Sequence, residues 1–290
     1  MYLINAEFYL GRKETRTPMQ HPLIYLRNLH QRVFQRSLLG QLLLFKRPLA
    51  AGRRIHLVAA TRLSEADFWA QSALGQCLKT PTARADVVVH IHYANRQGLP
   101  TIYNQHIQNC AASHILLFVH DDVTFDDDNW PELVRAGLGQ FDVIGVAGNV
   151  RLQENQPAWL FKPTLTDQPA FVWDHGFLSG AIFHPVKKQR VKQLYGHMPM
   201  PCQVLDGVFL AVDCAYLKRA RVRFDEQFAF HFYDMDFCRS AGRAGLSMAT
   251  WPVALTHLSM GAFGSAEWRR CWTLYQKKWS APSAAGSLTG

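Results

Sequence analysis

Short apolar runs alternate with helix-like segments from residue 53 onward, and this alternation predicts strands joined by helical crossovers. The predicted strands are residues 55–60, 86–91, 114–119 and 141–147. The predicted helices are residues 98–110 and 131–138. The run at 114–119 is apolar almost throughout, which indicates a strand covered on both faces. The pattern therefore predicts an α/β fold with a mostly parallel central sheet flanked by helices.

The stretch before this domain is typical of a basic amphipathic helix over residues 23–45. Its apolar side chains gather near one face, at Leu26, Leu29, Val33, Leu38 and Leu42. Its basic side chains lie elsewhere, at Arg27, Arg32 and Arg36, and the pattern ends at Pro48 and Gly52. Such a helix can lie on an anionic membrane surface, or it can dock on the protein with its basic face in water.

These patterns predict three parts in a chain of 290 residues. They are a basic helical N-terminal extension at 1–52, an α/β domain at 53–265 and a C-terminal tail at 266–290. The length suits one large domain with appendages. The last residues, from Ser280, are small and polar and are expected to fray.

Positive charge is concentrated at the amino end. The formal net charge is +9, and residues 1–54 hold ten Lys/Arg against two acids, so the rest of the chain is close to neutral. A basic end on a neutral body favours contact between that end and an anionic surface over a nucleic-acid groove across the body. No recognisable nucleic-acid-binding motif accompanies the charge, and we expect no nucleic-acid partner.

Cysteine spacing indicates a reducing location, and the hydropathy pattern argues against a secretion signal and a membrane span. No cysteine pair has the spacing of a zinc or redox motif, and we expect all six to be free thiols: Cys77, Cys110, Cys202, Cys214, Cys238 and Cys271. The amino terminus lacks the layout of a secretion signal. The longest charge-free stretch, 244–266, contains Pro252, His257 and two glycines near its end, which argues against a membrane span. The expected location is the cytoplasm, either soluble or peripheral at the inner face of the membrane.

Adjacent carboxylates follow the predicted strand at 114–119, in the sequence His120, Asp121, Asp122. Ligands of open parallel sheets bind outside the carboxyl ends of the strands. Carboxylate oxygens suit Mg²⁺ or Mn²⁺, which are held by one or two carboxylates plus substrate phosphates. Acids after a strand also form turns and helix caps, so this pair alone is a weak signal. The acidic run at 126–129 directly precedes a predicted helix, which favours capping over metal binding.

A second acidic pair lies in the aromatic segment 224–239. Asp234 and Asp236 are two residues apart, so they point away from each other in a strand or a helix. Asp236 fits the first turn of a helix that runs to Gly245, where it complements the helix dipole. Asp234 is left to face a cleft, where aromatic neighbours raise its proton affinity and suit it to act as a general base for an alcohol. The alternative is a carboxylate held only in backbone hydrogen bonds.

Taken in order, five motifs resemble those of family-2-like inverting glycosyltransferases: Asp121–Asp122, Asp206–Ala211, Phe224–Glu226, Tyr233–Asp236 and His257. The chain looks closest to the bacterial branch linked with capsule and surface-polysaccharide synthesis, and the resemblance covers residues 54–264. It implies the A-type glycosyltransferase fold, whose Rossmann-like half binds the nucleotide-sugar. It also implies Mn²⁺ or Mg²⁺ as cofactor, a glycan or lipid-linked acceptor, and single displacement at the anomeric carbon.

The resemblance assigns the metal and donor residues. Asp122 matches the metal-binding end of the family's Asp-x-Asp motif, and Asp121 beside it is expected to bind the metal with it; both are expected to contact the donor. His257 follows the apolar run 248–256, where it is either a structural histidine or, as in some members of the family, the residue that closes the metal site. Asn104 resembles the helix asparagine beside the donor. The first position of the metal motif departs from the family, because it is His120 instead of Asp.

The resemblance also assigns the acceptor side. Asp234 matches the catalytic base, and Asp206 with Gly207 matches the segment that lines the acceptor. The first predicted strand ends in Thr61–Arg62 and not in the family's usual Pro-x-Tyr/Phe-Asn turn, so the donor base is not assigned firmly, although a UDP-sugar is expected. Acceptor choice is expected to depend on a loop at 151–205, whose aromatic residues either stack on sugars or pack: Trp159, Trp173 and His175.

Two other functions compete with sugar transfer. A nucleotidyltransferase usually carries a glycine-rich phosphate loop after its first strand, and residues 61–64 contain no glycine. A non-catalytic scaffold or membrane-surface protein could keep the fold and use only the basic helix. The presence of Asp122, Asp234 and His257 together argues against a scaffold.

Overall fold

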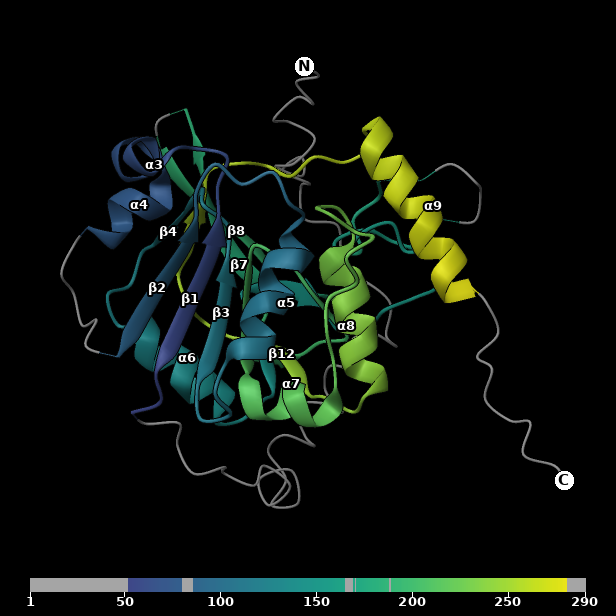
Figure 1. Cartoon of the computed structure of the whole chain (residues 1–290). Coiled ribbons are helices and arrows are strands. Elements are labelled where there is room, and N and C mark those ends of the chain that lie inside the picture. The colour runs from purple at the N-terminus through teal and green to yellow at the C-terminus, as the bar shows by residue number, and fades with distance from the viewer. Residues whose placement is uncertain (1–51, 80–85, 165–168, 170, 188, 281–290) are drawn as a thin grey trace, which may run out of the picture. The chain divides into compact units, whose positions relative to one another are not determined.

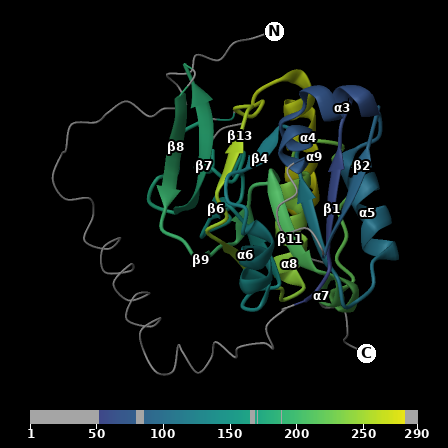
Figure 2. The same cartoon turned by 90° about the vertical axis from the view of Figure 1, so that its left-hand side faces the viewer.

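The computed structural model describes residues 52–79, 86–164, 169, 171–187 and 189–280. The predicted helix at 23–45 lies outside these residues. In the described part, helices flank two β-sheets (Figures 1 and 2), so the predicted α/β fold class is confirmed. None of the described helices is long and apolar enough to cross a bilayer.

The larger sheet has the strand order β2-β1-β3-β11-β5-β12-β9. Its strands are β1 (Ile55–Ala60), β2 (Val87–His92), β3 (Ile115–Val119), β5 (Val143–Gly145), β9 (Met200–Pro201), β11 (Phe209–Asp213) and β12 (Met248–Thr250). β1 pairs in parallel with β2 and β3, and β5 pairs in parallel with β12. β11 is inserted antiparallel between β3 and β5. All residues of β3 and β11 are buried, as the apolar run at 114–119 predicts for β3.

The smaller sheet has the order β10-β6-β7-β13-β4, with β8 paired to β7. Its strands are β4 (Val123–Phe125), β6 (Ala147–Asn149), β7 (Leu178–Val186), β8 (Gln189–Gly196), β10 (Val204–Leu205) and β13 (Leu255–His257). The expectation of a loop at 151–205 is therefore wrong, since this region supplies four strands. In Figure 2 the β7–β8 hairpin stands at the outer side of this sheet.

The described helices are α3 (Glu65–Gln71), α4 (Ala73–Leu78), α5 (Leu99–Asn109), α6 (Trp130–Leu138), α7 (Cys214–Ala220), α8 (Tyr233–Arg243) and α9 (Ala266–Ser280). α5 and α7 lie on one face of the larger sheet and α6 lies on the other (Figures 1 and 2). Four residues of α9 are buried in the core, Trp268, Cys271, Trp272 and Tyr275. Packing therefore continues past residue 265, while the three-part division of the chain stays a prediction.

Two apolar runs that look like single strands in the sequence are each divided between the sheets. The run at 141–147 changes sheet at Val146, with β5 before it and β6 after it. The run at 248–256 changes sheet over residues 251–254, which contain Pro252. Proline has no N–H group for a strand ladder, so it suits a break between strands.

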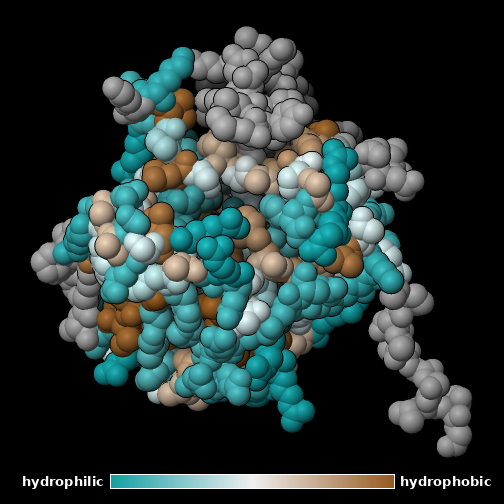
Figure 3. All heavy atoms as spheres, turned by 45° about the horizontal axis from the view of Figure 1, so that its top comes forward, coloured by the Kyte–Doolittle hydropathy of each residue, from teal (hydrophilic) through white to brown (hydrophobic). Residues whose placement is uncertain are grey.

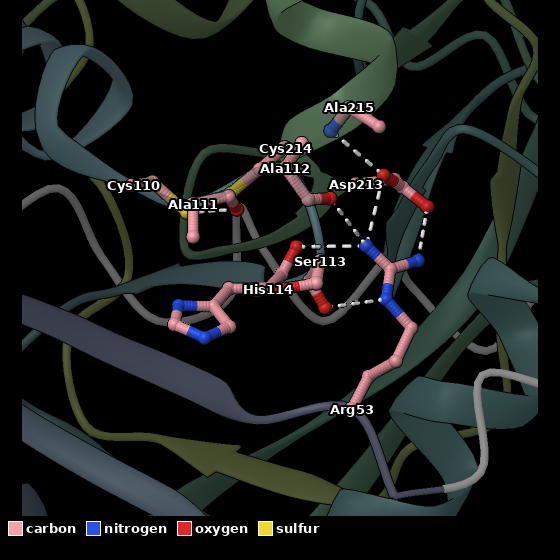
Figure 4. Close-up of polar contacts among 9 residues, drawn as sticks. All are labelled: Arg53, Cys110, Ala111, Ala112, Ser113, His114, Asp213, Cys214 and Ala215. Carbon is pink, nitrogen blue, oxygen red and sulfur yellow. Dashed lines mark hydrogen bonds and ion pairs between the residues drawn. A yellow bond between two sulfur atoms is a disulfide. The ribbon is translucent and has the colours of Figure 1, made fainter.

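Arg53 joins the starts of three core elements (Figure 4). Its guanidinium is paired with the buried Asp213 at the end of β11 and donates to the carbonyl oxygens of Ser113 and His114 over 2.9 Å, just before β3. Asp213 in turn accepts from the backbone N–H of Ala215 and caps α7. This one ion pair therefore holds the entry to β1, the entry to β3 and the turn from β11 into α7.

A disulfide lies beside this ion pair and joins Cys110, at the end of α5, to Cys214, at the start of α7 (Figure 4). The expectation of six free thiols is wrong for these two residues. The other four cysteines are not disulfide-bonded: Cys77, Cys202, Cys238 and Cys271. Sequence spacing cannot reveal the pair, because Cys110 and Cys214 are 104 residues apart and only the packing of α5 against α7 brings them together.

Replacing both bonded cysteines by serine is expected to lower the free energy of unfolding by about 2–4 kcal/mol, because the cross-link restricts the unfolded chain. Guanidinium unfolding followed by circular dichroism, with and without reductant, measures the change. Reductant should destabilise the wild-type chain and leave the doubly substituted chain unaffected. Equal stability of the oxidised wild type and the double variant would show that the bond contributes nothing.

Candidate active site

His120, Asp122 and His257 form a cluster whose ligand atoms all lie within 4.8 Å of one another. His120 and Asp122 belong to the segment that leads from β3 into β4. His257 ends β13, where it stands opposite Val123 in the antiparallel pair of β13 and β4. Its Nε2 lies 3.2 Å from Oδ1 of Asp122. The register of two short strands therefore brings together residues that are 135 positions apart in the chain.

A tyrosine from α8 orients His120. The hydroxyl of Tyr233 donates to the carbonyl oxygen of Gly207 over 2.9 Å and lies 2.9 Å from Nε2 of His120. Because the single hydroxyl proton goes to Gly207, His120 donates its Nε2–H to the tyrosine oxygen. This assigns the tautomer and leaves Nδ1 with a free lone pair, as a metal ligand requires.

The charges of the cluster suit a divalent cation. Burial, together with the nearby His257, lowers the pKa of His120 to about 4, so this imidazole is neutral at pH 7. Burial alone would raise the pKa of Asp122, but the hydrogen bond from His257 and the charges of both histidines lower it well below its usual range. Asp122 is therefore ionised at neutral pH. Two imidazoles and one carboxylate form a ligand set that leaves other coordination positions open for a substrate.

A pocket of about 970 Å³ opens beside the cluster, at the carboxyl ends of β1 and β2. Its polar lining includes Thr61, Arg62, Asn95, Arg96 and Asp121. A smaller space of about 110 Å³ shares Ala60, Leu99, Asp121 and Phe230 with it and reaches His120 and Asp122. Figure 3 views this end of the molecule, where hydrophilic residues cover most of the visible surface and hydrophobic ones form small patches. The two spaces are therefore neighbours, one lined by Arg62 and Arg96 and the other by two residues of the cluster.

Asp121 and Asn104 occupy different places from the cluster. Asp121 lies outside the group of three ligands, lines both spaces and is hydrogen-bonded to Thr61, while burial raises its pKa. Asn104 is buried and exchanges two hydrogen bonds with the backbone of Phe224, at 2.9 and 3.0 Å, while its amide also donates to Glu226. Asn104 thus ties α5 to the segment before α8. The donor-binding roles of both residues, and a metal-binding role of Asp121, stay predictions.

Asp234, Asp206 and Gly207 come together on the other side of Tyr233. The carboxylate of Asp234 accepts from the N–H groups of Gly207, at 3.1 Å, and Met235, at 2.8 Å. Asp206 accepts from the N–H of Val208 over 2.9 Å. Burial, with repulsion from Asp206, raises the pKa of Asp234 to about 7. Asp234 is therefore poised to exchange a proton near neutral pH.

Gly207 permits this arrangement by lacking a side chain. A Cβ at this position would lie 2.2 Å from the hydroxyl oxygen of Tyr233. The chain enters α8 through Phe232, whose backbone is in the left-handed region at φ 65°. This sharp entry places Tyr233 and Asp234 against Gly207 at the start of the helix.

Asp236 has the structural role predicted for it. It lies in the first turn of α8, fully buried, and is 2.7 Å from Nζ of Lys278. Trp279 also donates its indole N–H to this carboxylate over 2.9 Å. Asp236 thus fastens α8 to α9 while Asp234 faces Gly207.

Several residues of the site are not apparent from the sequence. His120 departs from the family's metal motif in sequence, yet in the structure it belongs to the three-residue cluster. Arg62, Arg96 and Phe230 line the larger pocket, and Phe230 is unusually exposed, at 52%, for an aromatic residue. Residues just after β1 and β2 were the available signal, because ligands bind at the carboxyl ends of parallel strands. Trp159, by contrast, is a buried packing residue.

Residues 64–279 match the sequence profile of a family described as "Glycosyltransferase like family". This match includes every residue of the cluster and of the Asp234 group. No match was found among curated proteins.

The fold is similar to several solved structures, at low sequence identity. A mannosyltransferase from Pyrobaculum calidifontis, solved with GDP-Man and Mn²⁺, is 11% identical with a TM-score of 0.44, over 87% of this chain and 70% of that one. TarS 1–349 from S. aureus is 13% identical with a TM-score of 0.40, over 71% and 60%. The catalytic domain of Drosophila β1,4-galactosyltransferase 7, solved with xylobiose, is 13% identical with a TM-score of 0.37, over 75% and 79%.

Asp122→Asn is expected to abolish the Mn²⁺-dependent binding of UDP, because the amide removes the only anionic ligand of the three-residue cluster. Calorimetric titration of UDP in the presence and absence of Mn²⁺ measures this. Asp128→Asn, at an exposed carboxylate ahead of α6, is the matched control and should bind as the wild type does. Unchanged affinity in Asp122→Asn would remove Asp122 from the site.

Proposed function

The chain belongs to the glycosyltransferase-like family, and we propose that it is an A-type, inverting enzyme that transfers a hexose from a nucleotide diphosphate-sugar to an acceptor hydroxyl. The observation that carries the proposal is that Asp122 and Asp234, which are connected through Tyr233, have pKa values shifted in opposite directions. Asp122 is ionised beside two imidazoles, and Asp234 has a pKa near 7. A sugar transferase needs both a site for the leaving diphosphate and a base for the acceptor.

The donor would occupy the pocket at the ends of β1 and β2. Arg62 and Arg96 line it and offer positive charge to a diphosphate, and the cluster lies at its inner end. His120, Asp122 and His257 would hold the cation, and their mixed nitrogen and oxygen donors favour Mn²⁺ over Mg²⁺, which prefers an all-oxygen shell. Bound there, the cation neutralises the charge that develops on the leaving diphosphate. A UDP-sugar is the donor that we propose.

Asp234 would remove the proton of the acceptor hydroxyl. The acceptor oxygen then forms a bond to the anomeric carbon, while the bond from that carbon to the diphosphate oxygen breaks and its electron pair stays on the diphosphate. This single displacement inverts the anomeric configuration. The N–H groups of Gly207 and Met235 hold the carboxylate of Asp234 in one orientation, and Asp206 would line the acceptor side.

We propose a glycan or lipid-linked acceptor and a role in the synthesis of surface polysaccharide, such as capsule, at the cytoplasmic face of the membrane. The resemblance of the ordered motifs to that branch of the family supports this assignment. The basic segment 23–45 supports it as well, because an amphipathic helix with arginines can hold the enzyme beside anionic lipids, where lipid-linked acceptors lie.

Asp234→Asn is expected to reduce turnover by about 10²–10⁴ while UDP binding is kept, because the amide preserves the shape and cannot accept the proton. The wild-type rate should also depend on this ionisation. A base with its pKa raised to about 7 is active when deprotonated, so activity should be full above pH 7 and should fall as the pH drops below it. Steady-state transfer assays across pH measure both effects.

Two variants test the assignment of the base. Asp128→Asn should retain the wild-type rate and pH profile, since this carboxylate is exposed and belongs neither to the three-residue cluster nor to the lining of the two spaces. Asp236→Asn should lower the melting temperature, because it weakens the contact with Lys278, and should affect chemistry less. Loss of turnover in Asp236→Asn, with activity retained in Asp234→Asn, would reverse the two roles.

Removal of residues 1–52 is expected to weaken binding to anionic vesicles. Each basic residue near the surface contributes about 1 kcal/mol at best, and the effect should shrink as salt is added. Sedimentation with phosphatidylserine vesicles compares the full chain with a chain that starts at Arg53. Equal binding by the two chains would exclude the segment 23–45 as the membrane contact.

A further inference from the structure

Five histidines lie together between the edge of the larger sheet and α5. They are His56 on β1, His90 and His92 on β2, His106 on α5 and His114 just before β3. All five are partly exposed. The ring of His56 stacks on those of His114 and His90, with centroid distances of 4.6 and 5.1 Å, and the rings of His90 and His106 are tilted at 55° with a centroid distance of 4.8 Å. The proposed sugar transfer uses none of these residues.

Two pairs of imidazole nitrogens are in direct contact within this layer. Nδ1 of His56 lies 2.9 Å from Nε2 of His90, and Nε2 of His92 lies 2.8 Å from Nε2 of His106. The second pair joins a strand to a helix, and the two rings are almost perpendicular, at 88°. In each neutral pair one nitrogen donates its proton to the other. When that proton moves to the far nitrogen of its own ring, both lone pairs face the same gap.

We propose that His92 and His106 form a second metal site, which binds a late first-row transition cation such as Cu²⁺, Ni²⁺ or Zn²⁺. Two imidazole nitrogens at about 2.0–2.1 Å from one cation, at adjacent corners of a square or octahedron, lie about 2.9 Å apart. The 2.8 Å between the Nε2 atoms of His92 and His106 matches this spacing. Rotation of the two rings away from the hydrogen-bonded arrangement would aim both lone pairs at one ion.

The ligand chemistry separates this site from the one at Asp122. Imidazole nitrogens suit Cu²⁺, Ni²⁺ and Zn²⁺, whereas Mg²⁺ selects oxygen ligands. Among the described residues, three ligand atoms come mutually within 4.8 Å only at His120, Asp122 and His257, so His92 and His106 supply two ligands and water completes the shell. Burial lowers the pKa of His92, and burial with the charges of His90 and His92 lowers that of His106 to about 4. Both rings therefore keep free lone pairs at pH 7.

His92 and His106 flank a segment of the chain that lines the larger pocket. His92 ends β2, His106 lies on α5, and the segment 93–98 connects the two elements. Four residues of this segment line the larger pocket, Ala94, Asn95, Arg96 and Gln97. A cation between His92 and His106 would fasten the strand before the segment to the helix after it. The second site would thus brace one wall of the pocket without contacting it.

Copper binding to an untagged full-length chain tests the proposal. His257→Gln is introduced first in every protein, so that the cluster at Asp122 is impaired and does not dominate the signal. In this background Cu²⁺ should bind at pH 7.5 and give an electron paramagnetic resonance spectrum with hyperfine lines from two nitrogens. Adding His92→Gln or His106→Gln should weaken Cu²⁺ binding about tenfold or more and remove the two-nitrogen pattern.

The controls separate lost ligands from lost folding. Gln keeps a hydrogen-bonding nitrogen, and the melting temperature of each variant is measured first with EDTA. Ni²⁺ should raise the melting temperature of the background protein and not that of the His106→Gln variant. His175→Gln, at an exposed histidine on another part of the chain, should bind Cu²⁺ as the background does. Absence of Cu²⁺ binding in the background, or unchanged affinity and spectrum in both His92→Gln and His106→Gln, would overturn the proposal.

Discussion

The candidate site depends on how the chain passes between the two sheets. β3 leaves the larger sheet at residues 120–122 and β11 enters it after residues 206–208, and backbone groups at such crossings need partners outside the strand ladders. The N–H of His120 donates to the carbonyl of Val208 over 3.2 Å, so the two crossings are bonded to each other. The carbonyl of Asp122 accepts from the N–H of Leu258 over 3.0 Å, just after β13. Satisfying these groups fixes the segment that carries the metal cluster beside the segment that carries Asp206 and Gly207.

The two carboxylates of the proposed mechanism, Asp122 and Asp234, differ in pKa because their surroundings differ. Asp122 and Asp234 are both removed from water, which raises a carboxylate pKa. At Asp122 two histidines outweigh that effect, so it stays ionised and can hold a cation. At Asp234 no cation compensates, and the neighbouring Asp206 adds repulsion, so its pKa rises to about 7. The same fold therefore provides an ionised carboxylate at Asp122 and a carboxyl group at Asp234 that titrates near neutral pH.

Local patterns predicted those parts of the fold that depend on local sequence. Apolar runs and helix starts mark β1, β3, α5 and α6 in the sequence, while the roles of Asp122, His257 and Asp234 rest on the order of motifs that resembles a family and stay predictions. Features that depend on pairing between distant segments of the chain cannot be predicted from these local patterns. β8 alternates exposed and half-buried residues at an edge, so its sequence resembles that of a loop and does not reveal the hairpin with β7. Cys110 meets Cys214 only through packing, and the pairing of β4 with β13 next to His120 brings His257 into the same cluster.

One chain of hydrogen bonds connects the cluster of His120, Asp122 and His257 to Asp234, the proposed base. It runs from His120 to the hydroxyl of Tyr233, then to the carbonyl of Gly207, whose N–H in turn binds Asp234. Tyr233 and Asp234 are neighbours at the start of α8, so a shift of this helix would move the partner of the metal ligand and the base together. The 2.2 Å that would separate a Cβ at residue 207 from the tyrosine oxygen leaves room only for glycine. The orientations of His120 and Asp234 therefore both depend on the contact between Tyr233 and Gly207, so under the proposed mechanism one contact positions both a ligand of the cation and the base.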